Sequence, residues 1–287
     1  MSIKVAVVTG ANKGIGFGIV KGLCEKFTGT IYLTARDVQR GETAVKELEK
    51  LGHKPKFHQL DITDQSSVDR FKDYLKETHG GLDVLVNNVG IAYQMDSPVP
   101  FAEQADETMN VNFFGLVRIC KALFPLLRPY ARVVNVSSSL GHLARIPGKS
   151  LREKIGSPTL TEDELVNLMK DFVESSKNNT HETDGWSPSA YFVSKVGVSA
   201  LSFVHQRQFD AEADKRPGIC VNAVHPGFVA TDMTKDMDLK PEWSVEQGAD
   251  APLYLALLPI ENTAVKGCFV WKDRTIYDWK SEDCALY

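Results

Sequence analysis

Cysteine is scarce in this sequence of 287 residues, and its placement excludes two common structural roles. The five cysteines are Cys24, Cys120, Cys220, Cys268 and Cys284. They are odd in number and widely spaced, and no two form a C-x-x-C pair, so neither a disulfide framework nor a zinc ribbon is expected. The seven histidines also lack the spacing of metal ligands. The sequence therefore predicts reduced thiols and no bound metal.

Long hydrophobic runs and dense basic runs are absent as well. No apolar stretch approaches the length of about 20 residues that crosses a bilayer, and the strand-like segment 5–9 begins too early to leave room for a cleavable leader. Lysine and arginine number 33 against 37 aspartates and glutamates, which gives a net charge of −4. No basic run could follow a phosphate backbone. We expect a cytoplasmic protein with neither nucleic acid nor membrane as a partner.

Short β-branched segments alternate with amphipathic ones along most of the chain. Strands are predicted at residues 5–9, 30–34, 56–60, 84–87, 132–137, 218–224 and 267–270, and helices at residues 16–27, 38–51 and 66–79. Asp37 and Asp64 lie where helix N-caps are expected. This alternation predicts an α/β fold in a single domain: a doubly wound (Rossmann) sheet of seven parallel strands with helices on both faces, and ligands at the carboxyl ends of the strands.

A glycine-rich turn follows the first predicted strand and opens the first predicted helix. Its residues include Gly10, Asn12, Lys13, Gly14, Ile15 and Gly16, in the pattern G-x-x-x-G-x-G. Glycines let the backbone turn tightly and let a pyrophosphate approach the helix N-terminus, whose free N–H groups favour an anion. The spacing differs from the G-x-G-x-x-G fingerprint, but its place between a strand and a helix predicts a dinucleotide site.

Charge after the second predicted strand indicates which nucleotide binds. A carboxylate there binds the ribose of NAD, whereas an arginine accommodates the 2′-phosphate of NADP. Arg36 occupies this place, and Lys13 can add a second cation. A shift of one position would make Asp37 the ribose ligand, but we interpret it as a helix cap. NADP(H) is the predicted cofactor, and Asp61-Ile62 would border its adenine unless Asp61 is only a loop residue.

Tyr191 and Lys195 are four residues apart. On a helix, side chains at this spacing share a face, so an ammonium would lie beside a phenol. A neighbouring positive charge favours the phenolate and lowers the pKa of the phenol from its ordinary value of about 10. A tyrosine tuned in this way can protonate a developing alkoxide. The spacing alone is common on solvated helices, and its weight comes from the motifs around it.

Five motifs occur in order along nearly the whole chain. They are the glycine turn, Asn87-Asn88-Val89-Gly90, the serine run Asn135-Val136-Ser137-Ser138-Ser139-Leu140-Gly141, Tyr191 to Lys195, and Pro226-Gly227. With them the chain resembles the short-chain dehydrogenase/reductase family, and most of all its monomeric NADPH-dependent carbonyl reductases. Besides the glycine turn and the Tyr191 and Lys195 pair, the resemblance implies cofactor contacts at Asn88, Gly90, Pro226, Gly227, Val229 and Thr231.

The resemblance also implies catalytic roles for Asn112, Ser138, Tyr191 and Lys195. Tyr191 would donate a proton to the substrate oxygen, while Lys195 would bind the nicotinamide ribose and lower the pKa of the phenol. Ser138 would hold the carbonyl oxygen against a fixed donor, although spacing alone does not choose it over either neighbouring serine. Asn112 would hold the water that connects Lys195 to solvent, or would only bend its helix.

A polar insertion at about residues 142–187 separates the serine run from Tyr191. A helix is predicted at residues 161–176, because Thr161 and Glu164 form a capping-box pattern. The insertion is either a surface excursion or a cover for a face used in assembly or substrate binding. In related dimers and tetramers the Tyr191 helix helps form the subunit interface, so the resemblance implies a monomer. The tail at residues 273–287 receives no predicted role.

Loops at the carboxyl ends of the strands supply candidates for a substrate cleft: Tyr93, Met95, Leu140, Trp186, Phe228, Met233 and Trp243. An apolar cleft suits quinones, aromatic ketones and aldehydes, or prostaglandin and steroid ketones. Val89 replaces the usual alanine beside the nicotinamide path, and we expect it to be tolerated. The cysteines and tryptophan familiar around residues 222–228 in vertebrate carbonyl reductases are absent, which puts glutathione-linked substrates in doubt.

The main hypothesis is NADPH-dependent reduction of small carbonyl compounds to alcohols. The first alternative is an NADP-dependent dehydrogenase of a steroid, prostaglandin or other secondary alcohol, in which Tyr191 as phenolate would be the base. The second alternative is a nucleotide-sensing regulator that keeps the fold without turnover. Against the regulator, all four catalytic positions are filled.

Overall fold

The computed structural model describes residues 3–94, 96–235, 237, 239–262 and 264–282. Within them lies one sheet of eight strands: β1 Val5–Val8, β2 Thr30–Ala35, β3 Lys56–Gln59, β4 Leu82–Asn87, β5 Leu127–Val136, β6 Cys220–Val224, β7 Phe269–Val270 and β8 Ile276–Tyr277. Their spatial order is β3-β2-β1-β4-β5-β6-β7-β8. The seven predicted parallel strands are confirmed. The antiparallel β8 is an addition that two residues are too few to reveal by hydrophobic period.

The chain changes its direction across the sheet at β1, which pairs with both β2 and β4. In doubly wound sheets a crevice opens beyond the carboxyl ends of the strands at such a switch point. The glycine turn follows β1, Arg36 follows β2 and Asn88 follows β4. The sheet therefore brings three segments that are far apart in the sequence to one edge.

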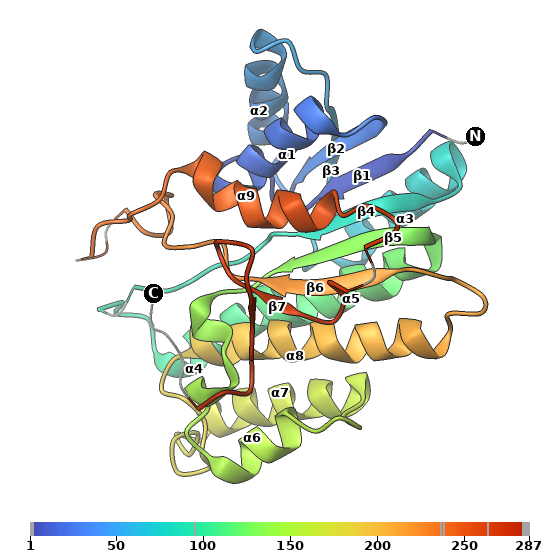
Figure 1. The fold of residues 1–287 in the computed structure, drawn as a ribbon. Coiled ribbons are helices and arrows are strands. Elements are labelled where there is room, and N and C mark those ends of the chain that lie inside the picture. Colours follow the sequence, from blue (N-terminus) through green and yellow to red (C-terminus); the bar gives the residue numbers. More distant parts are fainter. Residues whose placement is uncertain (1–2, 95, 236, 238, 263, 283–287) are drawn as a thin grey trace.

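Helices cover both faces of the sheet (Figure 1), and a separate hydrophobic layer lies on each face. Val5 and Val7 of β1 belong to one layer and Ala6 and Val8 to the other, as the alternation of a strand requires. The helices of the first layer include α3 Gln65–His79, α4 Phe101–Met109, α5 Gly115–Leu123 and α8 Ala190–Ala211, and those of the second are α1 Gly14–Lys26, α2 Val38–Lys50 and α9 Val245–Ala256. The predicted arrangement of helices on both faces is confirmed.

Local capping explains where the first helices begin. Asp37 Oδ1 accepts a hydrogen bond from Arg40 N at 2.8 Å, at the start of α2. Asp64 Oδ1 accepts one from Ser66 N at 2.9 Å, at the start of α3. Both predicted N-caps are confirmed, because each side chain satisfies an N–H group that the first helical turn leaves unpaired.

The insertion forms a further helical layer outside α8 (Figure 1). It contains α6 (Lys149–Ile155) and α7 (Glu162–Lys177), and α7 packs against α4 and α8. Thr161 Oγ1 accepts from Glu164 N at 3.3 Å, and Glu164 Oε2 accepts from Thr161 N at 2.8 Å. The predicted capping box is confirmed, and it starts α7 where it can cover α8.

Polar and aromatic contacts attach the insertion to the core. Glu162 Oε2 lies 2.7 Å from Nε2 of the buried His205 on α8, and Glu162 Oε1 lies 3.0 Å from Lys121 Nζ on α5. Trp186 is only 2% exposed, and its ring centroid lies 5.5 Å from that of Phe172 on α7. The prediction that Trp186 lines a substrate cleft is therefore wrong, because its ring is buried against Phe172 of the insertion.

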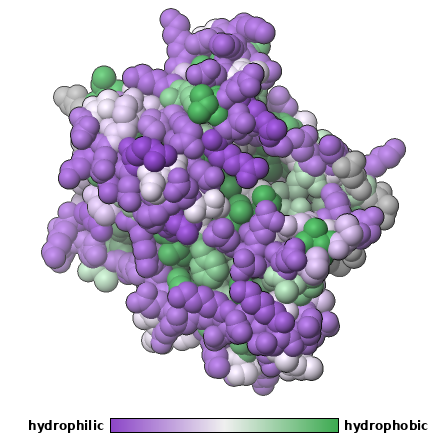
Figure 2. Space-filling model, turned by 180° about the vertical axis from the view of Figure 1, so that it is seen from behind, coloured by the Kyte–Doolittle hydropathy of each residue, from purple (hydrophilic) through white to green (hydrophobic). Residues whose placement is uncertain are grey.

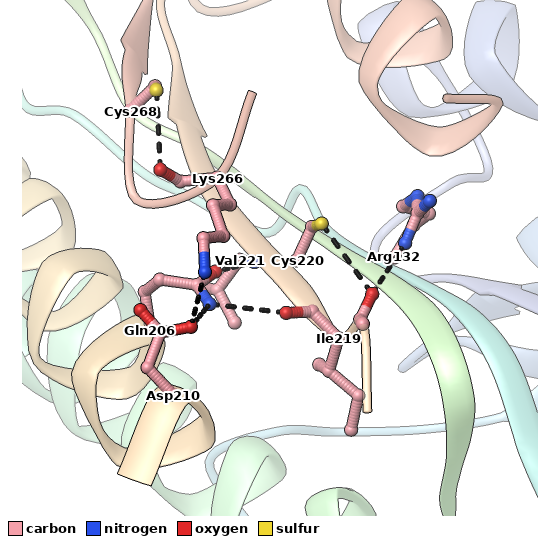
Figure 3. A network of polar contacts seen from close by, with 9 residues as sticks. Arg132, Gln206, Asp210, Ile219, Cys220, Val221, Lys266 and Cys268 are labelled. Carbon is pink, nitrogen blue, oxygen red and sulfur yellow. Dashed lines mark hydrogen bonds and ion pairs between the residues drawn. The ribbon is translucent and has the colours of Figure 1, made fainter. Parts of the chain in front are cut away.

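A buried polar network ties the second half of α8 to β6 (Figure 3). Gln206 Oε1 accepts from Val221 N at 2.7 Å, and Gln206 Nε2 donates to the Ile219 carbonyl at 3.1 Å. Arg132 Nη1 on β5 donates to the Gly218 carbonyl at 2.9 Å. These bonds fix the second half of α8 relative to β6.

Hydrophilic side chains dominate the face shown in Figure 2, and hydrophobic ones form small patches between them. The exposed large hydrophobic residues in the described ranges are Ile3, Val38, Leu51, Tyr130, Leu239, Ile260 and Ile276. Single exposed apolar side chains are normal on folded domains. Among the helices of the described residues, none is both long enough and apolar enough to cross a membrane.

Candidate active site

The backbone of the glycine turn leaves a cradle without side chains at the start of α1. Gly10 and Gly14 have φ angles of 61° and 56°, in the region that glycine adopts most readily. A β-carbon on Gly16 would lie 2.5 Å from Asn88 Nδ2 and 2.8 Å from the Gly10 carbonyl oxygen. The N–H groups and dipole of the helix N-terminus favour a phosphate at this place.

Asn88 joins the glycine turn to the end of β4. Its Nδ2 donates to the carbonyl oxygens of Thr9 at 3.1 Å and Gly10 at 3.0 Å. Val89 packs on the same turn, since a β-carbon on Gly10 would lie only 2.7 Å from Val89 Cγ2. The valine is accommodated because Gly10 has no side chain.

A group of charged side chains lies at the outer end of the glycine turn. Lys13 Nζ lies 2.6 Å from Asp232 Oδ2, and both side chains are exposed. The Lys13 ammonium, with smaller contributions from Lys235 and Arg40, lowers the pKa of the Asp232 carboxyl. Arg36, at the end of β2, is also exposed. Three segments thus bring the cations Lys13, Arg40 and Lys235 to the surroundings of Asp232.

Asp61 and Ile62, the predicted adenine border, follow β3. Asp61 Oδ1 accepts from Thr63 N at 2.9 Å and from Thr63 Oγ1 at 2.7 Å. Ile62 is buried, and its carbonyl accepts from Arg118 Nη1 at 2.7 Å. The loop therefore uses one carboxylate oxygen of Asp61 to hold its own shape, and an adenine contact of this residue stays a prediction.

Tyr191 and Lys195 lie on the first turns of α8, and the serine run lies beside them. Lys195 Nζ is 5.7 Å from the centroid of the Tyr191 ring and donates to the Val136 carbonyl at 2.9 Å. The Ser138 side chain lies beside the phenol of Tyr191 and acts to lower its pKa. The phenol, the ammonium and one serine hydroxyl therefore converge at the carboxyl end of β5.

Burial sets the pKa values of this pair. It lowers the pKa of Lys195 from 10.5 to about 8, and it raises the pKa of Tyr191 from 10.0 to about 12, against the opposing hydrogen bond from Ser138. The spacing of Tyr191 and Lys195 predicted a lowered phenol pKa, and in this structure that prediction is wrong. Desolvation of the phenolate outweighs the opposing effect of Ser138, so Tyr191 keeps its proton at neutral pH.

The three consecutive serines differ in what they contact. Ser137 Oγ lies 3.1 Å from the Lys195 carbonyl and 2.7 Å from Ser199 Oγ, so it is engaged with the body of α8. Ser139 is buried. Ser138 is half-buried and meets Tyr191. Of the three, Ser138 is the one whose contacts suit an oxygen-binding role.

Asn112 fastens the segment after β4 to the helix beside it. It lies in a π-helical turn, Asn110–Phe114, of a kind often found at functional sites. Its Oδ1 accepts from Ile91 N at 2.8 Å, and its Nδ2 donates to the Ile91 carbonyl at 2.9 Å and to Ser194 Oγ at 3.0 Å. A β-carbon on Gly90 would lie 3.3 Å from Lys195 Nζ. Asn112 therefore has a clear structural role, and the water-holding role stays a prediction.

The loop after β6 closes on the glycine turn. Pro226 is buried, and Gly227 has a φ of 96° and packs against Trp243, whose Cδ2 would lie 3.3 Å from a β-carbon there. Val229 is buried and pairs with Trp243 through an isolated bridge. Thr231 Cγ2 would lie 3.3 Å from a β-carbon on Gly14. The structure thus brings these predicted cofactor residues to the glycine cradle.

Comparison with known proteins agrees with this geometry. The family model described as short chain dehydrogenase matches residues 4–150. Carbonyl reductase (NADPH) 3 of Rattus norvegicus is 49% identical over 277 residues, 96% of this chain and 98% of the relative. This chain belongs to the short-chain dehydrogenase/reductase family. Two further proteins are similar to it: carbonyl reductase (NADPH) 1 of Homo sapiens, 48% identical over 96% of this chain and 99% of the relative, and the solved structure of salutaridine reductase from Papaver somniferum, with a TM-score of 0.81, 32% identity, and coverage of 93% and 99%.

Three residues near this reductase site were not predicted from the sequence. Arg40 stands four positions after Arg36 on the first turn of α2, a spacing that would have revealed it. Asp232 pairs with Lys13 across 219 positions, and no local pattern announces that contact. His225 precedes Pro226-Gly227 directly, yet its bond to the serine run needs the folded sheet.

The six remaining substrate candidates of this short-chain dehydrogenase/reductase fall into three groups. Leu140, Phe228, Met233 and Trp243 are half-buried on loops at the carboxyl edge. The Tyr93 hydroxyl donates to Glu107 on α4. Met95 lies outside the described residues. Their service as a substrate cleft stays a prediction.

Proposed function

We propose that this chain reduces carbonyl compounds, among them quinones and aromatic ketones or aldehydes, to alcohols with NADPH. The observation that carries the proposal is the meeting of Tyr191, Ser138 and Lys195 at the carboxyl edge of the sheet, beside the glycine cradle. Relatives that match nearly the full chain and are named carbonyl reductase (NADPH) support it. Prostaglandin and steroid ketones belong to the same substrate proposal.

The residues of the edge fit NADP(H). The glycine cradle fits a pyrophosphate, and the exposed cations Lys13 and Arg36 fit a 2′-phosphate. When bound there, NADPH supplies the hydride. The residues proposed to hold it are Gly10, Asn12, Lys13, Gly14, Ile15, Gly16, Arg36, Asp61, Ile62, Asn88, Gly90, Tyr191, Lys195, Pro226, Gly227, Val229 and Thr231.

The proposed chemistry of the protein side chains is a proton transfer. Tyr191 donates its phenolic proton to the carbonyl oxygen as that oxygen gains negative charge. Ser138 holds the same oxygen with its hydroxyl, so that the charge develops against a donor already in place. Lys195 binds the nicotinamide ribose and stabilises the phenolate left on Tyr191. Asn112 is proposed to hold the water through which Lys195 reaches solvent.

Burial raises the pKa of Tyr191 to about 12, so the phenol that donates a proton is the form present at neutral pH. Oxidation of a secondary alcohol uses the phenolate as base, and the alcohol dehydrogenase remains the alternative function.

The function is tested by mixing the purified chain with NADPH and a panel of menadione, isatin and a prostaglandin ketone, while the absorbance of the cofactor is followed. Consumption of NADPH that depends on the carbonyl compound is the expected result. Tight binding of NADPH without turnover of any carbonyl would favour the nucleotide-sensing alternative instead.

Arg36→Ala and Lys13→Ala are each expected to raise the KM for NADPH about 10-fold or more, because a charge-assisted bond to the 2′-phosphate is lost. The KM for NADH, which has no such phosphate, should change less than about twofold. Steady-state kinetics with both cofactors provides the check. Equal effects on NADH and NADPH would remove the phosphate assignment.

Asp232→Asn is the matched control, and its expected effect has the opposite sign. Asp232 competes with a 2′-phosphate for Lys13. Its neutral replacement should lower the KM for NADPH by up to about fivefold, the usual range for exposed ion pairs, and leave that for NADH unchanged. A raised KM for NADPH would show that Asp232 assists binding of the cofactor.

We also infer a single-domain, cytoplasmic monomer. The insertion helix α7 covers α8, the helix that meets a second subunit in related oligomers, and Glu162 fixes it to His205. Sedimentation at micromolar protein should give one species of about 32 kDa, the mass of one chain of 31.8 kDa. A stable dimer whose interface includes α8 would contradict the covering role of the insertion.

A further inference from the structure

Distant parts of the chain hold the turn that carries Ser138. We call residues 137–143 the serine turn; it begins where β5 ends and contains a short 3-10 helix, Ser139–Gly141. Ser138 Oγ accepts from Leu140 N at 3.2 Å, which caps this helix. The direction of the Ser138 hydroxyl therefore depends on how firmly the serine turn is held.

The C-terminal segment forms hydrogen bonds with the far end of the serine turn. Trp279 Nε1 donates to the Gly141 carbonyl at 2.7 Å, and the Trp279 carbonyl accepts from Leu143 N at 3.2 Å. One residue earlier, the Asp278 carbonyl lies 2.9 Å from His142 Nε2. Three consecutive residues of the turn's end are thus bonded to two residues of a segment more than 130 positions away.

Trp279 also packs against the helix that carries Tyr191. Trp279 is only 4% exposed, and its ring centroid lies 4.9 Å from that of Phe203 on α8. The indole therefore contacts both the serine turn and α8. Its position sets the distance between the two elements that bring Ser138 and Tyr191 together.

His225 holds the near end of the serine turn. Its Nδ1 accepts from Ser139 N at 2.9 Å, and its backbone N–H donates to the Val270 carbonyl at 2.8 Å. The ring is buried against Trp271, with centroids 4.4 Å apart. Burial, with a smaller effect of Lys272, lowers the pKa of His225 to about 3, so the imidazole is neutral and Nδ1 remains an acceptor at physiological pH.

We infer that Trp279 and His225 are positioning residues for Ser138, an inference that rests on the reductase function proposed above. His225 fixes the backbone directly after Ser138, and Trp279 fixes the backbone three residues after it. The hydroxyl is thereby kept directed at the Tyr191 phenol before substrate arrives. Both residues act on the reaction through Ser138, and the C-terminal segment becomes part of the catalytic apparatus.

Trp279→Phe tests this directly, because it keeps an aromatic ring against α8 and removes the N–H that Gly141 accepts. We expect kcat to fall about 5- to 50-fold, less than the roughly 10²- to 10³-fold expected when the Ser138 hydroxyl is removed outright. The KM for NADPH should stay within about twofold of its original value. An unchanged kcat in the folded variant would overturn the role of Trp279.

A double-mutant cycle separates positioning from general stability. In a Ser138→Ala background, Trp279→Phe should cost little or nothing further, because the group that it positions is already gone. The same loss of kcat in both backgrounds would show that Trp279 acts elsewhere. Ser138→Ala with full turnover would refute the proposed function, whereas a large loss in Ser138→Ala with none in Trp279→Phe would refute only this inference.

His225 offers a second test that does not depend on the tryptophan. His225→Asn keeps an acceptor near the position of Nδ1, whereas His225→Leu keeps bulk and loses the acceptor. We expect the asparagine variant to retain most of kcat and the leucine variant to lose about as much as Trp279→Phe. Equal losses in the two variants would overturn the role of His225.

Amide hydrogen exchange gives a measurement that needs no turnover. In Trp279→Phe without cofactor, the amides of the serine turn should exchange faster, while those of β1 should keep their original rates. Unchanged exchange in the serine turn would contradict the inference even if kcat fell.

Discussion

Tyr191→Phe is expected to lower kcat for carbonyl reduction by about 10²- to 10⁴-fold, the range that a positioned general acid supplies. The phenylalanine ring fills the same space on α8 but has no proton to give. Binding of NADPH should weaken far less than kcat falls, because Tyr191 is one of many proposed cofactor contacts and the phosphate contacts lie at the other end of the site. Stopped-flow or steady-state absorbance gives kcat, and cofactor fluorescence gives the binding constant.

Tyr74→Phe is the matched control for this substitution. It removes a phenolic hydroxyl that lies 3.0 Å from Tyr32 Oη, on α3 and away from the Tyr191 site. Its kcat should equal that of the original chain. Turnover by Tyr191→Phe within a few-fold of the control would mean that another group donates the proton, and the proposed mechanism would be wrong.

Lys195→Met is expected to affect activity and stability in opposite directions. Loss of the ammonium should lower kcat by at least about 10²-fold, because the phenolate left after proton donation is no longer stabilised. At pH 7 the free energy of unfolding of the variant should nevertheless be about 1–2 kcal/mol higher than that of the original chain. Burial lowers the pKa of Lys195 from 10.5 to about 8, so the folded chain carries its charge at a cost of up to about 3 kcal/mol. The unpaired Val136 carbonyl offsets part of this gain.

The stability gained by Lys195→Met should depend on pH. Between about pH 8 and 10.5 the unfolded chain binds more protons at Lys195 than the folded chain, so the stability of the original protein rises with pH across this window. The advantage of Lys195→Met should therefore shrink above pH 8 and disappear near pH 10. Urea unfolding of both proteins at pH 7 and pH 9.5 measures it. A variant that is less stable than the original at pH 7 would show that the buried ammonium stabilises the fold.

Features whose partners are near in the sequence were predicted well. The caps at Asp37 and Asp64 and the Thr161 capping box join residues two or three positions apart, so their side chains meet whenever a helix forms. The hydrophobic periods located the seven parallel strands for a similar reason, because alternation is a property of each segment alone. The strand β8 has only two residues and left no such signal.

Features that depend on burial or on distant partners were not predictable. The direction of the Tyr191 pKa was wrong because the desolvation of a phenol depends on everything packed around it. The contact between Asp232 and Lys13 joins residues 219 positions apart. Trp186 was predicted to line a cleft, but it packs against Phe172 of α7 in the core.

The sequence by itself determined the doubly wound fold, the glycine cradle and the spacing that places Tyr191 and Lys195 on one helical face, because each of these follows from short-range geometry. Only the tertiary structure decided which of three adjacent serines meets the phenol, since Ser137 is engaged with α8 and Ser138 is left facing Tyr191. Only the tertiary structure also linked Trp279 to the serine turn, across 138 positions. The physical reason is that hydrogen-bond partners and burial are properties of a closed core, which no single segment contains.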